Sequence, residues 1–144
     1  MTRSVLFSSL LLVSACSVAA QAAAAQTYAC AASNAPESLA LKDYVVRLTG
    51  GDATLAKKRQ GYLLPATAAS QVQIAKTKSV CQQAAQAYNK AVRGPTAPPI
   101  SRTVVVIKVG TTRYVVRDPA ELQGEFQVTV IFDAAFAPLR SFNS

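Results

Sequence analysis

The first 25 residues constrain this chain most, because they decide the compartment it folds in and therefore the cysteine chemistry open to it. Arg3 supplies a short positive stretch, an apolar run covers 5–15, and small residues follow over 19–25. This order is typical of a secretory signal peptide. The apolar run is shorter than the about 20 residues that a helix needs to cross a bilayer. We therefore expect a signal peptide over 1–25 and a single small domain over 26–144.

Two modes of processing fit the leader. The alanines at 23–25 suit an ordinary signal peptidase, whereas residues 13–16 (Val-Ser-Ala-Cys) resemble a bacterial lipobox, which makes Cys16 a candidate lipidation site. Release after Ala25 is favoured because the lipobox match is short and begins with valine. Lipidation would instead anchor the domain to the outer membrane through acyl chains, without a membrane span. Both modes predict an exported protein, periplasmic or secreted.

Cys30 and Cys81 remain under either mode, since Cys16 leaves with the signal or carries lipid. In an oxidising compartment, two thiols in one small domain usually form a disulfide. The closed loop of about 50 residues would stabilise the fold by about 4 kcal/mol in the chain-entropy account. The sequence therefore predicts a Cys30–Cys81 disulfide, with two buried free thiols as the alternative.

Helical signals follow a polar lead-in over 26–35. Residues 36–49 carry apolar side chains at helical spacing, and a short helix is expected from Asp52 or Thr54 to Gln60. A third helix should begin with a capping box at 79–82 (Ser-Val-Cys-Gln) and end at Gly94-Pro95, where a stiff linker over 94–99 follows. Its apolar face consists of Cys81, Ala84, Ala85, Tyr88 and Val92.

The C-terminal third of the chain predicts strands. Their β-branched and alternating apolar residues are typical of an antiparallel sheet, and Asp118-Pro119 is expected to be a turn. The expected fold class is α+β: two or three helices followed by a four-stranded antiparallel β-meander, with the helices against one sheet face. The expected strands are 103–109, 113–117, 125–133 and 136–142, the last at an edge because of Pro138, with a shorter strand over 72–75.

The first hairpin leaves two registers open around Gly110-Thr111. A two-residue loop places Ile107 opposite Tyr114, but it also places Lys108 opposite Arg113, a like-charge pair that disfavours this register. A three-residue loop is the alternative, and the choice between them decides which face each side chain occupies.

The chain lacks the residues that several classes of enzyme reaction need. The chain has no histidine, so it can form neither a Ser-His-Asp nor a Cys-His site. It has no phosphate-binding glycine motif, and a cysteine pair is too small for a structural zinc site. We therefore expect no enzyme activity, no cofactor and no metal. A carboxylate pair would have to come from Glu37, Asp43, Asp52, Asp118, Glu121, Glu125 and Asp133.

Basic residues are the better candidates for binding. The net charge is +8, which favours anionic partners. Four side chains of the hairpin could share one sheet face and bind an anion, and a compact basic cluster covers 57–59; solvation and protection of the sheet edge are the alternative use of such residues. The candidate anion-binding residues are Arg102, Lys108, Arg113 and Arg117.

An aromatic stripe could line an apolar pocket, although its residues are also usual core residues. The stripe consists of Phe126, Phe132, Phe136 and Phe142.

Three short patterns resemble a set of short exported bacterial proteins without an assigned activity. They are Cys-x-x-Ala-x-x-Ala-Tyr-Asn at 81–89, Arg-Tyr-Val-Val-x-Asp-Pro at 113–119 and Val-x-Phe-Asp-x-x-Phe at 130–136. The resemblance implies export and one domain, and it brings no ligand or catalytic residue.

The sequence thus favours an exported, non-enzymatic binding or accessory domain of the bacterial envelope. Its expected partner is an anionic polymer or an envelope protein. Nucleic acid is not expected, and membrane contact is expected only if Cys16 is lipidated. One alternative is an inhibitor-like or assembly lipoprotein that recognises another envelope protein. Another is a hydrolase with an unrecognised site.

Overall fold

The computed structural model describes residues 28–50, 53–56, 58–96 and 102–143. The expected signal peptide, Cys16, Asp52, Lys57 and the end of the expected linker lie outside these residues. The elements in chain order are β1 (Tyr28–Cys30), α2 (Pro36–Thr49), α3 (Ala53–Ala56), α4 (Arg59–Tyr62), a 3₁₀ turn (Ala69–Gln71), β2 (Val72–Ile74), α5 (Lys78–Arg93), β3 (Arg102–Val109), β4 (Arg113–Gln123), β5 (Phe126–Asp133) and β6 (Pro138–Asn143).

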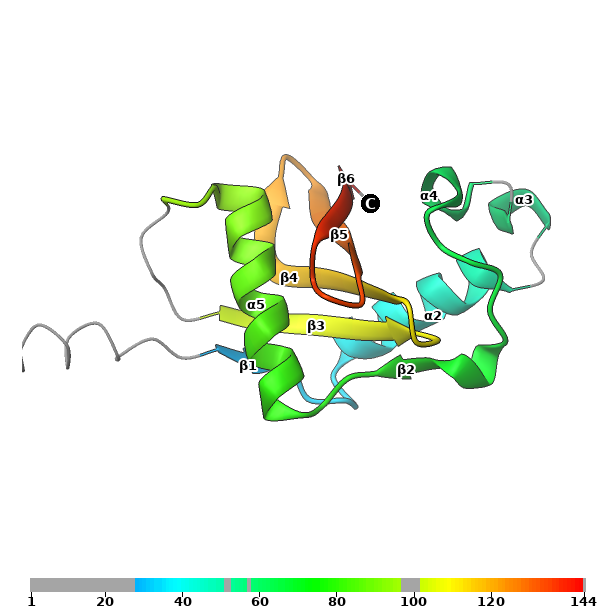
Figure 1. Ribbon diagram of the computed structural model, residues 1–144, viewed down its shortest axis with the longest axis horizontal. Coiled ribbons are helices and arrows are strands. Elements are labelled where there is room, and N and C mark those ends of the chain that lie inside the picture. Colours follow the sequence, from blue (N-terminus) through cyan, green and yellow to red (C-terminus); the bar gives the residue numbers. More distant parts are fainter. Residues whose placement is uncertain (1–27, 51–52, 57, 97–101, 144) are drawn as a thin grey trace, which may run out of the picture.

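The described residues confirm the α+β class and the antiparallel meander of β3, β4, β5 and β6 (Figure 1). The expected count of four strands is too low within the described residues, because two short strands join the sheet on the free side of β3. The short strand expected over 72–75 forms as β2, whereas β1 was not expected. β1 pairs with β3 in parallel, from Tyr28 opposite Arg102. β2 pairs antiparallel with the other end of β3, from Val72 opposite Val109. β6 lies at the opposite edge, as Pro138 predicts.

Helices cover both faces of the sheet, so the expectation of helices on one face is wrong. In Figure 1, α5 crosses in front of β3 and β4, and α2 lies behind them. Alternate residues of β3 point to opposite faces, so Val105 and Ile107 pack with α2, whereas Val104 and Val106 pack with α5. The helical core residues are Leu41, Val45 and Leu48 of α2 and Ala84, Ala85 and Tyr88 of α5.

The first hairpin adopts the three-residue loop. Val109 pairs with Arg113, and Lys108 pairs with Tyr114. Gly110 has a φ of 56°, in the left-handed region that glycine tolerates best. The two-residue register is therefore wrong, and the opposed pair Lys108–Arg113 that it required does not form.

Two local predictions are also wrong. α5 begins at Lys78, before the expected cap, and Ser79 Oγ accepts a hydrogen bond from Gln83 Nε2 at 3.0 Å instead of capping the helix. Asp118-Pro119 does not end its strand: β4 continues to Gln123 through an irregularity after Arg117. The Asp118 carboxylate accepts the backbone N–H of Ala120 at 2.8 Å, so its local hydrogen bond supports a bulge and not a chain reversal.

The four phenylalanines do not form one stripe. Phe132 is buried and Phe136 is half-buried on the α5 side, where Phe136 stacks on Tyr114 with ring centroids 4.4 Å apart. Phe126 is exposed, and Phe142 packs on the α2 side.

Candidate anion-binding site

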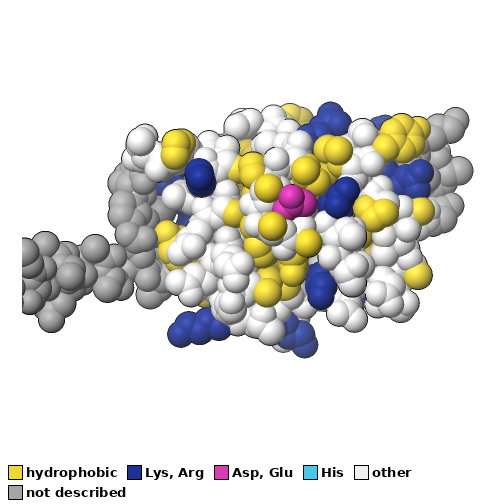
Figure 2. Space-filling model, in the orientation of Figure 1, with side chains coloured by type: hydrophobic (Ala, Val, Ile, Leu, Met, Phe, Trp, Pro, Cys, Tyr) yellow, Lys and Arg dark blue, Asp and Glu magenta, His cyan; other side chains and the backbone are white. Residues whose placement is uncertain are grey.

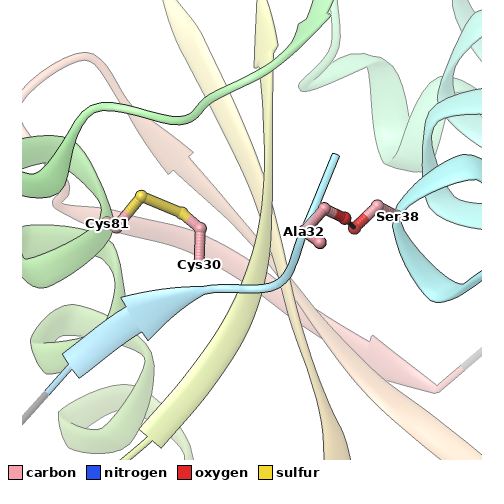
Figure 3. Close-up of a disulfide and its surroundings, with 4 residues drawn as sticks. All are labelled: Cys30, Ala32, Ser38 and Cys81. Atoms are coloured by element: carbon pink, nitrogen blue, oxygen red, sulfur yellow. Dashed lines mark hydrogen bonds between the residues drawn. A yellow bond between two sulfur atoms is a disulfide. The ribbon is translucent and has the colours of Figure 1, made fainter. Parts of the chain in front are cut away.

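The predicted disulfide joins Cys30 at the end of β1 to Cys81 in the first turns of α5 (Figure 3). The Cα atoms are 5.2 Å apart across a sequence separation of 51. Ser38 Oγ donates to the carbonyl of Ala32 at 2.8 Å, which holds the chain after β1 against α2. The segment 30–38 is therefore fastened to both helices, and it fixes the position of the N-terminal end of α5 relative to β3.

The structure does not bring the four predicted cations onto one face. Arg102 and Lys108 occupy the alternate positions of β3 that point to the α5 side. Since Arg113 pairs with Val109, Arg113 and Arg117 point to the α2 side. A shift of one residue in register moves every side chain of a strand to the other face, so the expectation of a shared face is wrong.

Arg102 is engaged within the protein. Its Nη1 lies 2.6 Å from Asp118 Oδ2, and its Nη2 lies 3.1 Å from Glu121 Oε2. The Arg102 side chain is 9% exposed and that of Asp118 is 2% exposed. This guanidinium already has two carboxylate partners, so we assign it a structural role.

Arg113 and Arg117 also bind groups of the protein. Arg113 Nε donates to the carbonyl of Leu63 at 2.8 Å, and its Nη1 donates to the carbonyl of Thr112. Arg117 Nε donates to Thr129 Oγ1 at 3.1 Å, and burial lowers the pKa of its guanidinium. Both side chains are only partly accessible.

Lys108 is the predicted cation that stays exposed, and three further lysines accompany it. Together they form what we call the lysine cluster: Lys42 on α2, Lys76 after β2, Lys78 at the start of α5 and Lys108 on β3. Figure 2 shows basic side chains projecting at the lower edge of the molecule, where β2 and the N-terminal end of α5 lie in Figure 1.

Three neighbouring hollows connect these lysines, with volumes of about 430, 480 and 450 Å³. Lys76 lines all three. The first also contacts Lys78 and the disulfide, the second contacts Lys42, and the third contacts Lys108. Among the described residues, no acidic side chain lines any of these hollows, and none of the four lysines forms an ion pair.

The start of α5 adds to this positive potential. The first backbone N–H groups of a helix carry partial positive charge, and acidic residues there are stabilising. α5 has no acidic residue in its first turn, and its N-cap residue Thr77 makes no side-chain capping bond. Lys78 stands there instead, where a cation is electrostatically unfavourable until an anion binds nearby.

Sequence reasoning missed Lys42, Lys76 and Lys78 because they come from elements far apart in the sequence. The available signal was the Lys76-Thr77-Lys78 pattern, which places two cations around a helix start. Lys42 could not be found in this way, because it joins the cluster through the packing of α2 beside β2.

A fourth hollow, larger than these three, has different chemistry. It measures about 690 Å³ and lies between α5 and the turn before β6. Alanine, glutamine and proline side chains and Phe136 line it, with Lys90 as its charged residue. It therefore lacks the concentration of cations that marks the lysine cluster.

Glu37, Asp118 and Glu121 lie around Arg102, whereas Asp43 and Asp133 have partners elsewhere. Asp118 and Glu121 bind Arg102, Asp43 pairs with Arg47, and Asp133 Oδ1 accepts the backbone N–H groups of Ala135 and Ala137. Within the described residues there is no group of three or more cysteine, aspartate or glutamate side chains arranged to hold a metal ion. Across those residues, no helix combines the length and the apolar character needed to span a membrane.

No family model matches this chain, and neither a curated protein nor a solved structure matches it.

Proposed function

We propose that this chain is an exported, non-enzymatic binding or accessory domain of the bacterial envelope, and that it binds an anionic ligand at the lysine cluster. The observation that carries the proposal is the set of three adjoining hollows lined by Lys42, Lys76, Lys78 and Lys108, with no acidic side chain of the described residues among their lining. Acidic polysaccharide and phosphorylated surface glycolipid are the ligand classes that a positive domain would meet outside the cytoplasm.

The arrangement favours an extended anion over a single small one. The hollows follow one another from the disulfide, past β2, to the end of β3, and Lys76 belongs to all three. A lysine ammonium is a point charge on a flexible side chain, and it lacks the planar set of N–H donors of an arginine guanidinium. Such a set suits a chain of repeating negative charges, whose groups need not match one rigid geometry.

The Cys30–Cys81 disulfide supports the exported location, because structural disulfides persist mainly in oxidising compartments. Release after Ala25 and lipidation at Cys16 remain the two proposed forms of the N-terminus. The intact mass of the protein isolated from its native envelope separates them: release leaves Gln26 as the first residue, whereas lipidation leaves an acylated Cys16.

The test is binding of polygalacturonate, an acidic polysaccharide, measured by calorimetry at two ionic strengths. We expect Lys76→Gln/Lys108→Gln to weaken binding about tenfold, and we expect added salt to weaken binding by the unmodified protein. The matched control, Lys90→Gln/Arg93→Gln, removes the same charge from the far end of α5 and should change affinity less than twofold. Equal losses in both variants would show an effect of net charge alone, and no binding by the unmodified protein would exclude this ligand class.

A further inference from the structure

A left-handed turn in α4 (Arg59–Tyr62) combines an unusual backbone with an exposed aromatic side chain. Within α4, Gln60 has φ 47° and ψ 59°, Gly61 has φ 71°, and Tyr62 has φ 63°. The left-handed region is costly for residues with a Cβ atom. Such strained residues persist only where their surroundings hold them, and they gather at functional sites.

Neighbouring elements hold this turn in place. Gln60 Nε2 donates to the Tyr44 hydroxyl of α2 at 2.9 Å. Arg113 Nε of β4 donates to the carbonyl of Leu63 at 2.8 Å, and Leu64 is buried in the α2-side core. Contacts on both sides thus hold the backbone of the turn, which fixes the positions from which Arg59 and Tyr62 extend.

The turn exposes an aromatic ring beside unpaired cations. Tyr62 is 68% exposed, and the Arg59 guanidinium carbon lies 5.6 Å from the centre of its ring. Arg59 Nε is buried without a hydrogen-bond partner. Within the described part of the chain, neither Arg59 nor Arg140 forms an ion pair.

Arg140 reaches this turn from β6, the edge strand. A Cβ atom at Gly61 would stand 2.6 Å from Arg140 Nη1, so the guanidinium lies directly over the glycine. Arg140 pairs with Ile131 of β5. Asp133 lies two residues further along that strand, opposite Arg113. Its carboxylate accepts backbone N–H groups of the following turn, at Ala135 and Ala137.

We propose that Arg59, Tyr62 and Arg140, which we call the arginine–tyrosine turn, form a docking surface for an acidic segment of a protein partner. Guanidinium groups bind carboxylates through paired N–H donors. Arginine and tyrosine, together with tryptophan, are enriched among the residues that dominate protein–protein binding energy. A fixed backbone lowers the entropy lost when such side chains are ordered on binding.

This surface is separate from the lysine cluster, and the proposal does not depend on the polysaccharide ligand. In Figure 1, α4 lies at the upper right, away from the N-terminal end of α5 at the lower edge. The turn contacts Tyr44 and Arg113 on the α2 side of the sheet, whereas Lys108 points to the α5 side. The chemistry also differs: the lysine cluster is a set of flexible point charges, whereas the turn combines planar guanidiniums with an exposed ring.

The probe is an array of twelve-residue peptides with varied spacing of aspartate and glutamate, each paired with its asparagine and glutamine counterpart. We expect a subset of acidic peptides to bind and their amide counterparts to bind at least tenfold more weakly. Arg59→Gln/Arg140→Gln should weaken binding of that subset about tenfold or more. Tyr62→Ser, which leaves net charge unchanged, should weaken it several-fold, while Lys76→Gln/Lys108→Gln should retain it.

Thermal unfolding of each variant checks that the fold is kept. Arg140→Gln alone alters an exposed side chain without ion pairs, so it remains a usable variant if the double variant is unstable. The proposal is overturned if no acidic peptide exceeds its amide counterpart, or if Arg140→Gln and Tyr62→Ser both leave peptide affinity unchanged. Binding at this turn by inorganic phosphate or by phosphatidylglycerol vesicles, without peptide binding, would also overturn it.

Discussion

Arg102 Nη1 lies 2.6 Å from Asp118 Oδ2, in an ion pair whose side chains are 9% and 2% exposed. Glu121 contributes a second carboxylate 3.1 Å from Arg102 Nη2. The pair joins the start of β3 to the irregular part of β4, where the regular pairing with β5 is interrupted. The most N-terminal of the predicted anion-binding residues therefore stabilises the sheet at its irregular point.

Loss of one partner from this pair should be costly. Arg102→Gln leaves the Asp118 carboxylate buried without its cation, and such changes destabilise proteins by about 3–5 kcal/mol. Denaturant unfolding measures the loss. The control is Arg47→Gln, because Asp43 and Arg47 form an exposed i,i+4 pair at 3.2 Å that should contribute no more than about 0.5 kcal/mol. Similar losses of unfolding free energy in both variants would show that the buried ion pair contributes no more to stability than the exposed one.

Removal of the disulfide should destabilise the protein without changing its fold. Cys81→Ala opens a loop with a sequence separation of 51, so the chain-entropy account gives a loss of about 4 kcal/mol. Cys30 in that variant should react with an alkylating reagent in the native state. Denaturant unfolding and intact mass after alkylation are the measurements. Two free thiols in the native, non-reduced wild-type protein would contradict the prediction.

Local signals in the sequence predicted part of the fold well. The helix expected over 36–49 is confirmed as Pro36–Thr49. Its two ends could be predicted because a proline occupies its first position and a glycine follows its last residue. The meander, the edge position of Pro138 and the disulfide are confirmed as well. These features depend on nearby residues or on the cysteine pair alone.

The sequence also carries a signal for helices on both faces of the sheet, and it lies in the apolar run of β3. Val104, Val105, Val106 and Ile107 are all at most 1% exposed, because α5 covers one face of β3 and α2 covers the other. A continuous apolar run is typical of a strand buried on both faces. That run was the available indication that helices lie on two sides of the sheet.

Which basic side chains come together in the folded protein depends on one extra loop residue in the first hairpin and on packing between distant parts of the chain. With Gly110–Thr112 as the loop, Arg113 moves to the α2 side, where it meets the carbonyl of Leu63. The contact between Arg140 and the turn at Gly61 joins positions 79 residues apart in the sequence, and no local pattern specifies it. Only the folded structure shows which cations have partners and which do not.

Substitution of Gly61 should separate backbone strain from the contact with Arg140. Gly61 has a φ of 71° and Gly124 has a φ of 62°, so alanine at either position should cost about 1–2 kcal/mol. Nothing lies within 4 Å of a Cβ atom at Gly124, whereas Arg140 Nη1 would lie 2.6 Å from one at Gly61. Because the Arg140 guanidinium is the end of a flexible side chain, we expect it to move aside.

Gly61→Ala and Gly124→Ala should therefore lose similar free energies of unfolding. Only Gly61→Ala should shift the NMR signal of the Arg140 guanidinium, and only this variant should weaken binding at the arginine–tyrosine turn. A much larger loss for Gly61→Ala would show that Arg140 is held rigidly over the turn, contrary to this expectation.

Tyr88 should make the fold sensitive to alkaline pH. Its ring is buried against the sheet, its hydroxyl donates to the carbonyl of Val128 at 2.9 Å, and burial raises the pKa of that hydroxyl above its usual value near 10. Above pH 10 the unfolded chain releases this proton while the folded state keeps it. The contribution of Tyr88 is thus fully present below pH 10 and is lost as pH rises from 10 toward the folded-state pKa, at up to about 1.4 kcal/mol per pH unit.

Tyr88→Phe tests this link, because it removes the titrating group and keeps the ring. At pH 7 the variant should be less stable by about 1 kcal/mol, since the carbonyl of Val128 loses its donor. Between pH 10 and 11 the difference in unfolding free energy between the two proteins should shrink and then reverse. Only the wild-type protein loses stability in this range, because its folded state must keep the Tyr88 hydroxyl protonated while its unfolded state releases the proton. Urea unfolding of both proteins at pH 7, 10 and 11 measures the three differences, and a constant difference across this range would show that Tyr88 does not couple folding to pH.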